Sequence, residues 1–253
     1  MSLHDVFLPF GLTPLGLAWM VVAILVAGFV RGYSGFGFSA MVIAASSLVM
    51  NPLHFVACVV VWEMVMSLQA WSGLGQNVDW KRVGLLLAGA VIGLPLGLWA
   101  LGTITEDQAR AVISGYILLM SVILLFGWRL RGETGPVAHF GAGIVSGLAN
   151  APGMGGLPVV AFFAAQGIPP AVFRATLVAY FPILDVYSGP VYWYNGMVTW
   201  PTVTTSLIGL PLVLLANWLG SRHFLSTDPK DFRRFAIILL AGLALLGLLK
   251  SVL

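Results

Sequence analysis

Four ionisable residues lie in otherwise apolar stretches, and they are the side chains of this sequence best suited to chemistry. Arg31 comes directly before a glycine cluster, and its planar guanidinium can hold two oxygens of one anion. Glu63 and Asp185 are acids inside apolar segments, where an acidic side chain costs about 2.5 to 3.5 kcal/mol to insert. Such acids are candidate proton carriers, and Arg174 is a second candidate contact for an anion.

Each of these residues also has a purely structural interpretation. Arg31 and Arg174 could be anchors whose charged ends reach the lipid headgroups. Glu63 could be a protonated or arginine-paired structural acid, and Asp185 could serve only in hydrogen bonding. A direct pair between Arg174 and Asp185 along one helix is disfavoured, because three turns separate them by about 16 Å. The sequence leaves these alternatives open.

The composition places the chain in a membrane. Hydrophobic residues make up 59% of the 253 residues and charged residues 8%, against about one half and one quarter in soluble domains. Residues 52–71 and 83–101 carry at most one charge each, and about 20 such residues match a hydrocarbon layer of about 30 Å. Because alternation of period two is absent and helices satisfy their own backbone in lipid, we expect an all-α integral membrane protein.

We expect five helical segments in each half of the chain, and the first two of each half are short. Sequence does not decide whether a short pair crosses the membrane fully or folds back as a re-entrant hairpin. The expected segments are 14–29, 36–50, 52–71, 82–102 and 109–127, then 137–149, 156–166, 170–193, 199–219 and 233–252.

The two halves resemble one another. Three glycine-containing stretches of the first half recur in order in the second: 28–32 at 143–147, 35–37 at 153–155, and 93–96 at 209–212. We therefore predict a first membrane repeat over residues 1–127, a polar cytoplasmic linker over 128–136, and a second membrane repeat over 137–253.

The halves are predicted to be inverted. Each short pair returns the chain to its starting side, so three further crossings put the linker opposite the N-terminus. With both termini outside, the cytoplasmic ends receive Arg31, Lys81, Arg82, Arg129, Arg131, Arg174, Arg222, Lys230, Arg233 and Arg234, and the outside only Arg110 and Lys250. This obeys the positive-inside rule. If the break at 32–37 were only a kink, each half would cross four times and the loop 221–234 would face outward.

The glycine clusters predict two interrupted helices. An unwound segment exposes backbone N–H and C=O groups that lipid cannot satisfy, so it must line a wet or ligand-filled cavity. Glycine permits positive φ, and the N-terminus of the resuming helix attracts anions. Paired interruptions in inverted halves indicate the binding site of a transporter. In the alternative interpretation, these glycines only allow close packing of helices.

We expect the groups at both interruptions to bind the substrate: Arg31, Gly32, Tyr33, Ser34, Gly35, Gly37, Ser39, Asn150, Gly153, Gly155 and Gly156, together with Arg174. Glu63 and Asp185 are the candidates for proton coupling. We expect no cofactor and no metal, because Cys58 is the single cysteine and no paired-histidine spacing occurs. No nucleic-acid partner is expected, since the basic residues stand at helix ends.

This arrangement resembles the sulfite exporter TauE/SafE family of membrane transporters over nearly the whole chain. The family's glycine pattern appears as Gly28, Gly32, Gly35 and Gly37, then as Gly143, Gly147, Gly153, Gly155 and Gly156, with Pro158 after the second cluster. Phe36 and Met154 stand between glycines where the commoner form has three in a row. The resemblance implies transport of sulfite, sulfoacetate or related sulfur anions across the bacterial inner membrane, usually as export.

We therefore expect a secondary active transporter that exports a small anion, coupled to the proton gradient, with membrane lipids as its other partners. A passive anion channel would use the same dipoles and arginines. An intramembrane serine hydrolase is a third alternative, because residues 32–35 resemble the surroundings of such a nucleophile. It lacks support, since no histidine is placed to act as the base. The sequence leaves open the anion, the direction, the stoichiometry and the oligomeric state, a dimer included.

Overall fold

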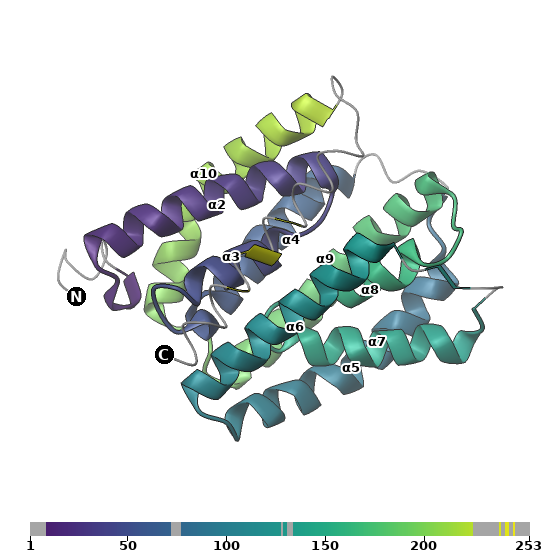
Figure 1. The fold of residues 1–253 in the computed structure, drawn as a ribbon, viewed down its shortest axis with the longest axis horizontal. Helices are drawn as coiled ribbons and strands as arrows, with labels where there is room; N and C mark the ends of the chain where they lie inside the picture. Colours follow the sequence, from purple (N-terminus) through teal and green to yellow (C-terminus); the bar gives the residue numbers. More distant parts are fainter. Residues whose placement is uncertain are drawn as a thin grey trace.

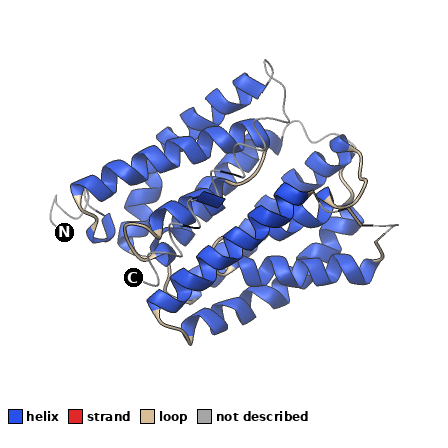
Figure 2. Cartoon of the chain, viewed as in Figure 1, coloured by secondary structure: helices blue, strands red, loops and turns tan. Residues whose placement is uncertain are grey.

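The structure, a computed structural model, describes residues 9–71, 77–127, 129–130 and 134–224, with positions 238, 241, 242 and 245. These residues form nine α-helices and two short 3-10 helices and contain no strand (Figure 2). The helices are α2 (Pro14–Ser34), α3 (Phe38–Ser46), α4 (Val56–Trp71), α5 (Trp80–Gly102), α6 (Glu106–Phe126), α7 (Pro136–Asn150), α8 (Gly156–Ala164), α9 (Pro170–Tyr194) and α10 (Trp200–Phe224), with η1 (Pro9–Gly11) and η2 (Pro52–Phe55). The all-α prediction is confirmed, and the expected segment 233–252 is described only at positions 238, 241, 242 and 245, which are helical.

Capping residues explain several helix boundaries. The hydroxyl of Thr13 accepts from the backbone N–H of Gly16 at 3.1 Å, and Pro14 occupies the first turn of α2. Thr105 and Gln108 form a capping box that starts α6. The same helix ends at Gly127, whose left-handed φ of 60° suits glycine.

Among the described residues, five helices are long and apolar enough to cross a membrane: α2, α5, α6, α9 and α10. The chain is a multi-pass membrane protein. The helices α3 and α8 have nine residues each, about 14 Å in length, which is under half of the hydrocarbon thickness of about 30 Å.

The prediction that α2 ends near residue 29 is wrong. This helix continues to Ser34, so Arg31 and Gly32 lie in its last turns and not in an unwound segment. Gly32 lies within the helix and serves close packing: because it has no side chain, α2 can approach α10 at this position. A Cβ atom at Gly32 would lie 2.0 Å from the backbone oxygen of Asn217. The helix ends only at Gly35, the first glycine after the start of α2 that has a positive φ.

The helices pair across the two halves of the chain. Figure 1 shows α2 beside α10 on one side of the molecule and α5 beside α7 on the opposite side, and α4 contacts α9 between these pairs. Glycines set the spacing in both outer pairs: a Cβ atom at Gly93 of α5 would lie 2.2 Å from the backbone oxygen of Ile144 in α7. The close-packing interpretation therefore holds for the glycines of these pairs, Gly28, Gly32, Gly143 and Gly147 among them.

Candidate functional site

Both predicted interruptions are present. After α2, Gly35 and Gly37 take φ values of 82° and 91°, and α3 begins at Phe38. The backbone N–H of Gly35 donates to the carbonyl oxygen of Arg31 at 2.7 Å and closes the end of α2. After α7, Gly153 takes a φ of 79°, and α8 begins at Gly156.

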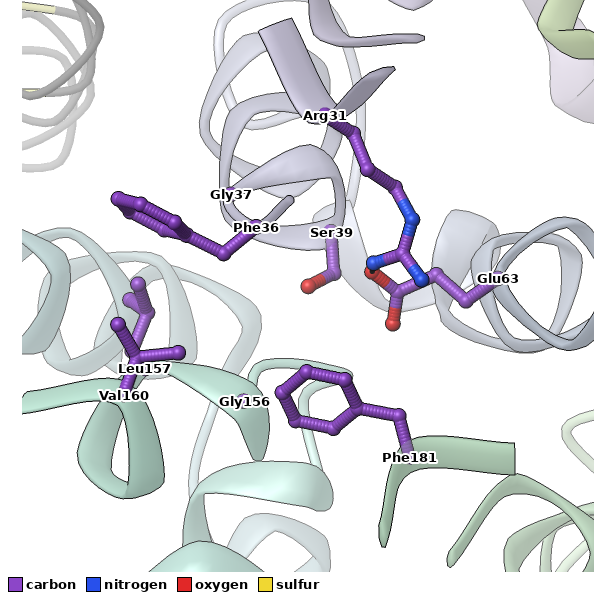
Figure 3. A pocket seen from close by; sticks show the side chains of 9 residues that line it. All are labelled: Arg31, Phe36, Gly37, Ser39, Glu63, Gly156, Leu157, Val160 and Phe181. Atoms are coloured by element: carbon purple, nitrogen blue, oxygen red, sulfur yellow. Dashed lines mark hydrogen bonds and ion pairs between the residues drawn. The ribbon is translucent and has the colours of Figure 1, made fainter. Parts of the chain in front are cut away.

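A small cavity lies between the two interruptions, and we call it the central cavity. Its lining comes from α2, α3, α4, α8 and α9 and from the segment between α2 and α3, and consists of Arg31, Phe36, Gly37, Ser39, Glu63, Gly156, Leu157, Val160 and Phe181 (Figure 3). The volume open to the centre of a water molecule is about 10 Å³, which is room for about one water. The N-terminal residues of both α3 and α8 border the central cavity, as expected if the two interruptions face one another.

Arg31 is the cation of the central cavity. Its Nη1 donates to Oε1 of Glu63 at 3.0 Å, and its Nη2 donates to the hydroxyl of Ser67 at 2.8 Å. The arginine side chain is 9% exposed and the glutamate side chain 15%, so this ion pair is largely removed from solvent. Arg31 therefore does not reach out to lipid headgroups, and the anchor interpretation is wrong for this residue.

Glu63 also lies beside the N-terminus of α3, where Ser39 lines the central cavity with it. Ser39 is the second residue of α3, where backbone N–H groups have no partner within the helix. The carboxylate thus holds the guanidinium and stands beside the helix end that the sequence offers to an anion. Figure 3 shows the guanidinium of Arg31 against the carboxyl group of Glu63, with Ser39 next to them.

Asp185 is the second buried acid near this ion pair. It is 5% exposed and interacts electrostatically with both Glu63 and Arg31. Its Oδ2 atom is buried and has no hydrogen-bond partner among the described residues. Asp185 thus lies within electrostatic range of the ion pair but is not among the residues that line the central cavity.

Hydroxyl groups satisfy the polar atoms at the second interruption. The side-chain amide of Asn150 donates to Ser188 at 2.7 Å, and the hydroxyl of Tyr192 donates to the backbone oxygen of Asn150. The hydroxyl of Ser146 donates to the backbone oxygen of Gly155 at 2.6 Å. These hydrogen bonds satisfy polar groups at the break that lipid cannot satisfy. Asn150 therefore supports the interruption and does not line the cavity.

Tyr180 extends this network, since its hydroxyl lies 2.7 Å from that of Ser146. In the alignment of the halves, Ser146 is the residue opposite Arg31. The two halves therefore place a neutral hydroxyl in one and a guanidinium in the other, so the charge at this site comes from the first half.

The structure places the other expected site residues at a range of positions. Gly37, Ser39 and Gly156 line the central cavity with Arg31. Outside the lining are Gly32, Tyr33, Gly35, Gly153 and Gly155, and nothing is described of the side chain of Ser34. Arg174 is exposed near the start of α9, so the structure does not bring it to the cavity.

Sequence reasoning missed Ser67 and the apolar part of the lining. Ser67 follows Glu63 by one helical turn on α4, and two polar residues four apart in an apolar helix were a usable signal. Phe181, Leu157 and Val160 carry no such signal, because apolar residues are common throughout this chain.

Comparisons with known proteins identify the family of this chain. The family model described as sulfite exporter TauE/SafE matches residues 20–246. The "Probable sulfite/organosulfonate exporter TauE" of Cupriavidus necator is 26% identical over 232 residues, 87% of this chain and 90% of that protein. The "Probable inner membrane transporter protein TsaS" of Comamonas testosteroni is 26% identical over 181 residues, 67% of this chain and 73% of that protein. No solved structure matches. With a family model that covers most of its length, this chain belongs to the sulfite exporter TauE/SafE family, a family of membrane transporters and not of enzymes.

Proposed function

We propose that this protein is a secondary active transporter that exports sulfite, sulfoacetate or a related organosulfonate across the bacterial inner membrane, coupled to proton movement. The observation that carries the proposal is the buried guanidinium of Arg31, which faces a cavity where the N-termini of α3 and α8 meet. A buried guanidinium and two helix N-termini form a site for an oxyanion.

The roles of the lining residues follow from their chemistry. Arg31 would hold two oxygens of the anion, and the N–H groups near Ser39 and Gly156 would bind a third. Phe36 and Phe181 would contact the organic part of a sulfonate. The cavity has room for about one water, so these aromatic side chains must move apart when an anion enters.

Glu63 and Asp185 are proposed as the proton-coupling residues. Both are buried near Arg31, and both can bind a proton without leaving the site. An ionisable residue held inside the membrane at a substrate site typically serves in a proton relay.

Inverted repeats over residues 1–127 and 137–253, joined by a cytoplasmic linker over 128–136, are proposed as the basis of alternating access. The contact pattern supports this proposal. Exchanging the halves turns the pair α2–α10 into α7–α5, and both pairs are close. The pair α4–α9 is exchanged with itself and lies beside the central cavity. We propose both termini outside, as the distribution of basic residues favours.

A passive anion channel is the second candidate, and the hydrolase alternative does not apply to this transporter family. A channel needs a wet path open to both sides, whereas a carrier opens one side at a time. The small cavity enclosed by Phe36, Leu157 and Phe181 supports the carrier.

The test is transport by the purified protein in proteoliposomes. Labelled sulfite, sulfoacetate, thiosulfate and sulfate are offered with and without a pH gradient. A carrier gives saturable flux and counterflow, in which an unlabelled anion inside the vesicles drives uptake of the label. Unsaturable flux without counterflow would show a channel, and no flux of any sulfur anion would refute the proposal. Arg31→Lys should raise the half-saturating concentration by roughly tenfold or more, because an ammonium cannot replace the two-pronged contact.

A further inference from the structure

Glu63 already occupies the part of the site that a substrate anion needs. Its carboxylate takes one nitrogen of Arg31 at 3.0 Å and lies beside Ser39 at the N-terminus of α3. Two anions cannot share this guanidinium in a buried site, because like charges in a low dielectric repel strongly. An incoming anion must therefore displace a charged Glu63 or find it neutral.

The charges around Arg31 can be counted. The groups that interact electrostatically with Glu63 are Arg31 from α2 and Asp185 from α9, and the phenol of Tyr192 from α9 also senses it. The other elements packed against α4 are α3, η2 and α10. Ser39 from α3 is neutral, and α10 presents the carbonyls of Thr202 and Ser206, which accept from Cys58 and Trp62. The titratable residue of η2 is His54, which is exposed. One guanidinium thus lies within electrostatic range of two carboxyl groups.

A buried group of charges is stable when its net charge is zero, and this condition decides which of the two acids is protonated. An ionised carboxylate with an unpartnered buried oxygen is costly, so Asp185 is the acid that holds a proton in the resting site. Arg31 and ionised Glu63 balance each other. When an anion with one negative charge binds Arg31, the balance is kept only if Glu63 takes up a proton.

We propose that this transporter carries an anion of single charge together with one proton, and that Glu63 is the residue that binds the proton. The inference rests on the proposed function and specifies that the proton moves in the same direction as the anion. Glu63 acts as a tethered substitute for the substrate: ionised, it closes the site by occupying Arg31, and protonated, it releases the guanidinium. The transported complex is electrically neutral, so the membrane potential does not drive it.

The rest of the lining favours a single charge as well. Phe36, Leu157, Val160 and Phe181 are apolar, and Arg31 is the cation among the lining residues. A dianion such as sulfate would leave one charge unbalanced in these surroundings. The preferred ligands are therefore bisulfite and sulfonates with an uncharged organic group, and sulfoacetate, a dianion at neutral pH, is disfavoured among the anions of the proposed function. Outward flux then depends on a high cytoplasmic concentration of the anion, and it is opposed by external acid.

The experiment uses methanesulfonate and sulfate. Methanesulfonate is the anion of a strong acid and stays a monoanion at every pH tested, and sulfate is a dianion of similar shape. The full chain is reconstituted in vesicles that contain a pH-sensitive dye, and the membrane potential is clamped with potassium and valinomycin. We expect one proton to move with each methanesulfonate, a rate unaffected by the clamped potential, and sulfate exchange slower by roughly tenfold or more. Methanesulfonate flux without protons, flux driven by the potential, or equal rates for sulfate would overturn the proposal.

Glu63→Gln provides the residue-level test, because glutamine imitates the protonated acid. In the wild type, the half-saturating concentration of methanesulfonate should rise with pH, by up to about tenfold for each unit. In Glu63→Gln it should be independent of pH, with counterflow retained and the proton no longer carried. Asp107→Asn, at an exposed acid of α6, is the matched control and should behave as the wild type. A pH dependence that persists in Glu63→Gln would overturn the assignment.

The outcomes separate this inference from the proposed function. If sulfite or a sulfonate shows counterflow but moves no proton, the protein is still a carrier and only the coupling proposal fails. If no sulfur anion shows counterflow in the wild type, the proposed function fails first.

Discussion

Arg31 on α2 and Glu63 on α4 form an ion pair 3.0 Å long at the edge of a cavity between two interrupted helices. Because both side chains are largely buried, each charge depends on the other. The pair joins α2 to α4 and at the same time holds the groups proposed to bind an anion and a proton. Its stability and its function can be separated by experiment.

The first prediction concerns the dependence of the two charges on one another. Arg31→Ala leaves the Glu63 carboxylate buried without its cation, and we expect the free energy of unfolding to fall by about 3 kcal/mol or more. Adding Glu63→Gln to this variant should recover much of the loss. Thermal unfolding in detergent measures the loss in the single variant and the recovery in the double variant. Arg82→Ala, which breaks a half-exposed pair with Asp79, should cost no more than about 1 kcal/mol. A double variant less stable than Arg31→Ala would contradict the coupling.

The second prediction concerns the backbone at the first interruption. Gly35 has a φ of 82°, and a Cβ atom there would meet nothing within 4 Å. Gly35→Ala should therefore cost about 1 to 2 kcal/mol through backbone strain alone. Gly35→Asn should cost less, because asparagine tolerates this conformation. Gly35→Val should also distort the break and abolish anion exchange while leaving membrane insertion intact.

Gly115→Ala is the control for this series, since Gly115 lies in α6 with equally open space and an ordinary φ. It should leave exchange unchanged and raise stability by roughly 0.5 to 1 kcal/mol. Equal stability of the alanine and asparagine variants at Gly35 would argue against backbone strain.

The sequence predicted the helices and the two interruptions well, because both follow from local signals. Runs of apolar residues set the spans, and the glycine clusters at 35–37 and 153–155 marked the breaks. Arg31 and Glu63 could each be singled out as a charge in an apolar stretch. Local signals also misled, since Gly32 looked like part of the break but packs against α10.

What the sequence could not provide is the pairing between helices. That Arg31 meets Glu63, and that Asp185 lies near both, depends on how α2, α4 and α9 pack. The same is true of the cavity wall, because Phe181 resembles many other phenylalanines in the sequence. Arg174 illustrates the converse: an arginine in an apolar helix that the fold leaves exposed and away from the cavity.

The third prediction concerns the second interruption. The hydroxyl of Tyr192 donates to the backbone oxygen of Asn150, which is otherwise cut off from water. Tyr192→Phe should cost about 0.5 to 1.5 kcal/mol, because it removes one of two hydrogen bonds to a buried carbonyl that keeps its bond from the backbone N–H of Gly153. Tyr194→Phe, on the same helix at a side chain 91% exposed, is the matched control and should be neutral. Thermal unfolding of the two variants side by side decides the matter, and equal melting temperatures would argue against this role.

The fourth prediction concerns the contact between α5 and α7. Gly93→Ala would place a Cβ atom 2.2 Å from the backbone oxygen of Ile144, so the helices must separate. We expect a loss of about 1 to 3 kcal/mol or more in the free energy of unfolding. Gly84→Ala, earlier in the same helix where a Cβ atom meets nothing within 4 Å, should stabilise by roughly 0.5 to 1 kcal/mol. If both variants behave alike, close packing is not the reason for the glycine at 93.

The fifth prediction concerns orientation, which rests on the placement of ten basic residues inside and two outside. Cys58 is buried in α4, so Cys58→Ala supplies a background free of other thiols for single cysteines. Thr103→Cys, in the exposed turn between α5 and α6, should react with a membrane-impermeant thiol reagent in intact cells. Gly135→Cys, exposed just before α7, should react only after the membrane is permeabilised. The two turns lie at opposite ends of α6, a helix long enough to cross the membrane, so one of them must be shielded in intact cells. Labelling of Gly135→Cys but not of Thr103→Cys would show the opposite orientation, with the linker before α7 outside.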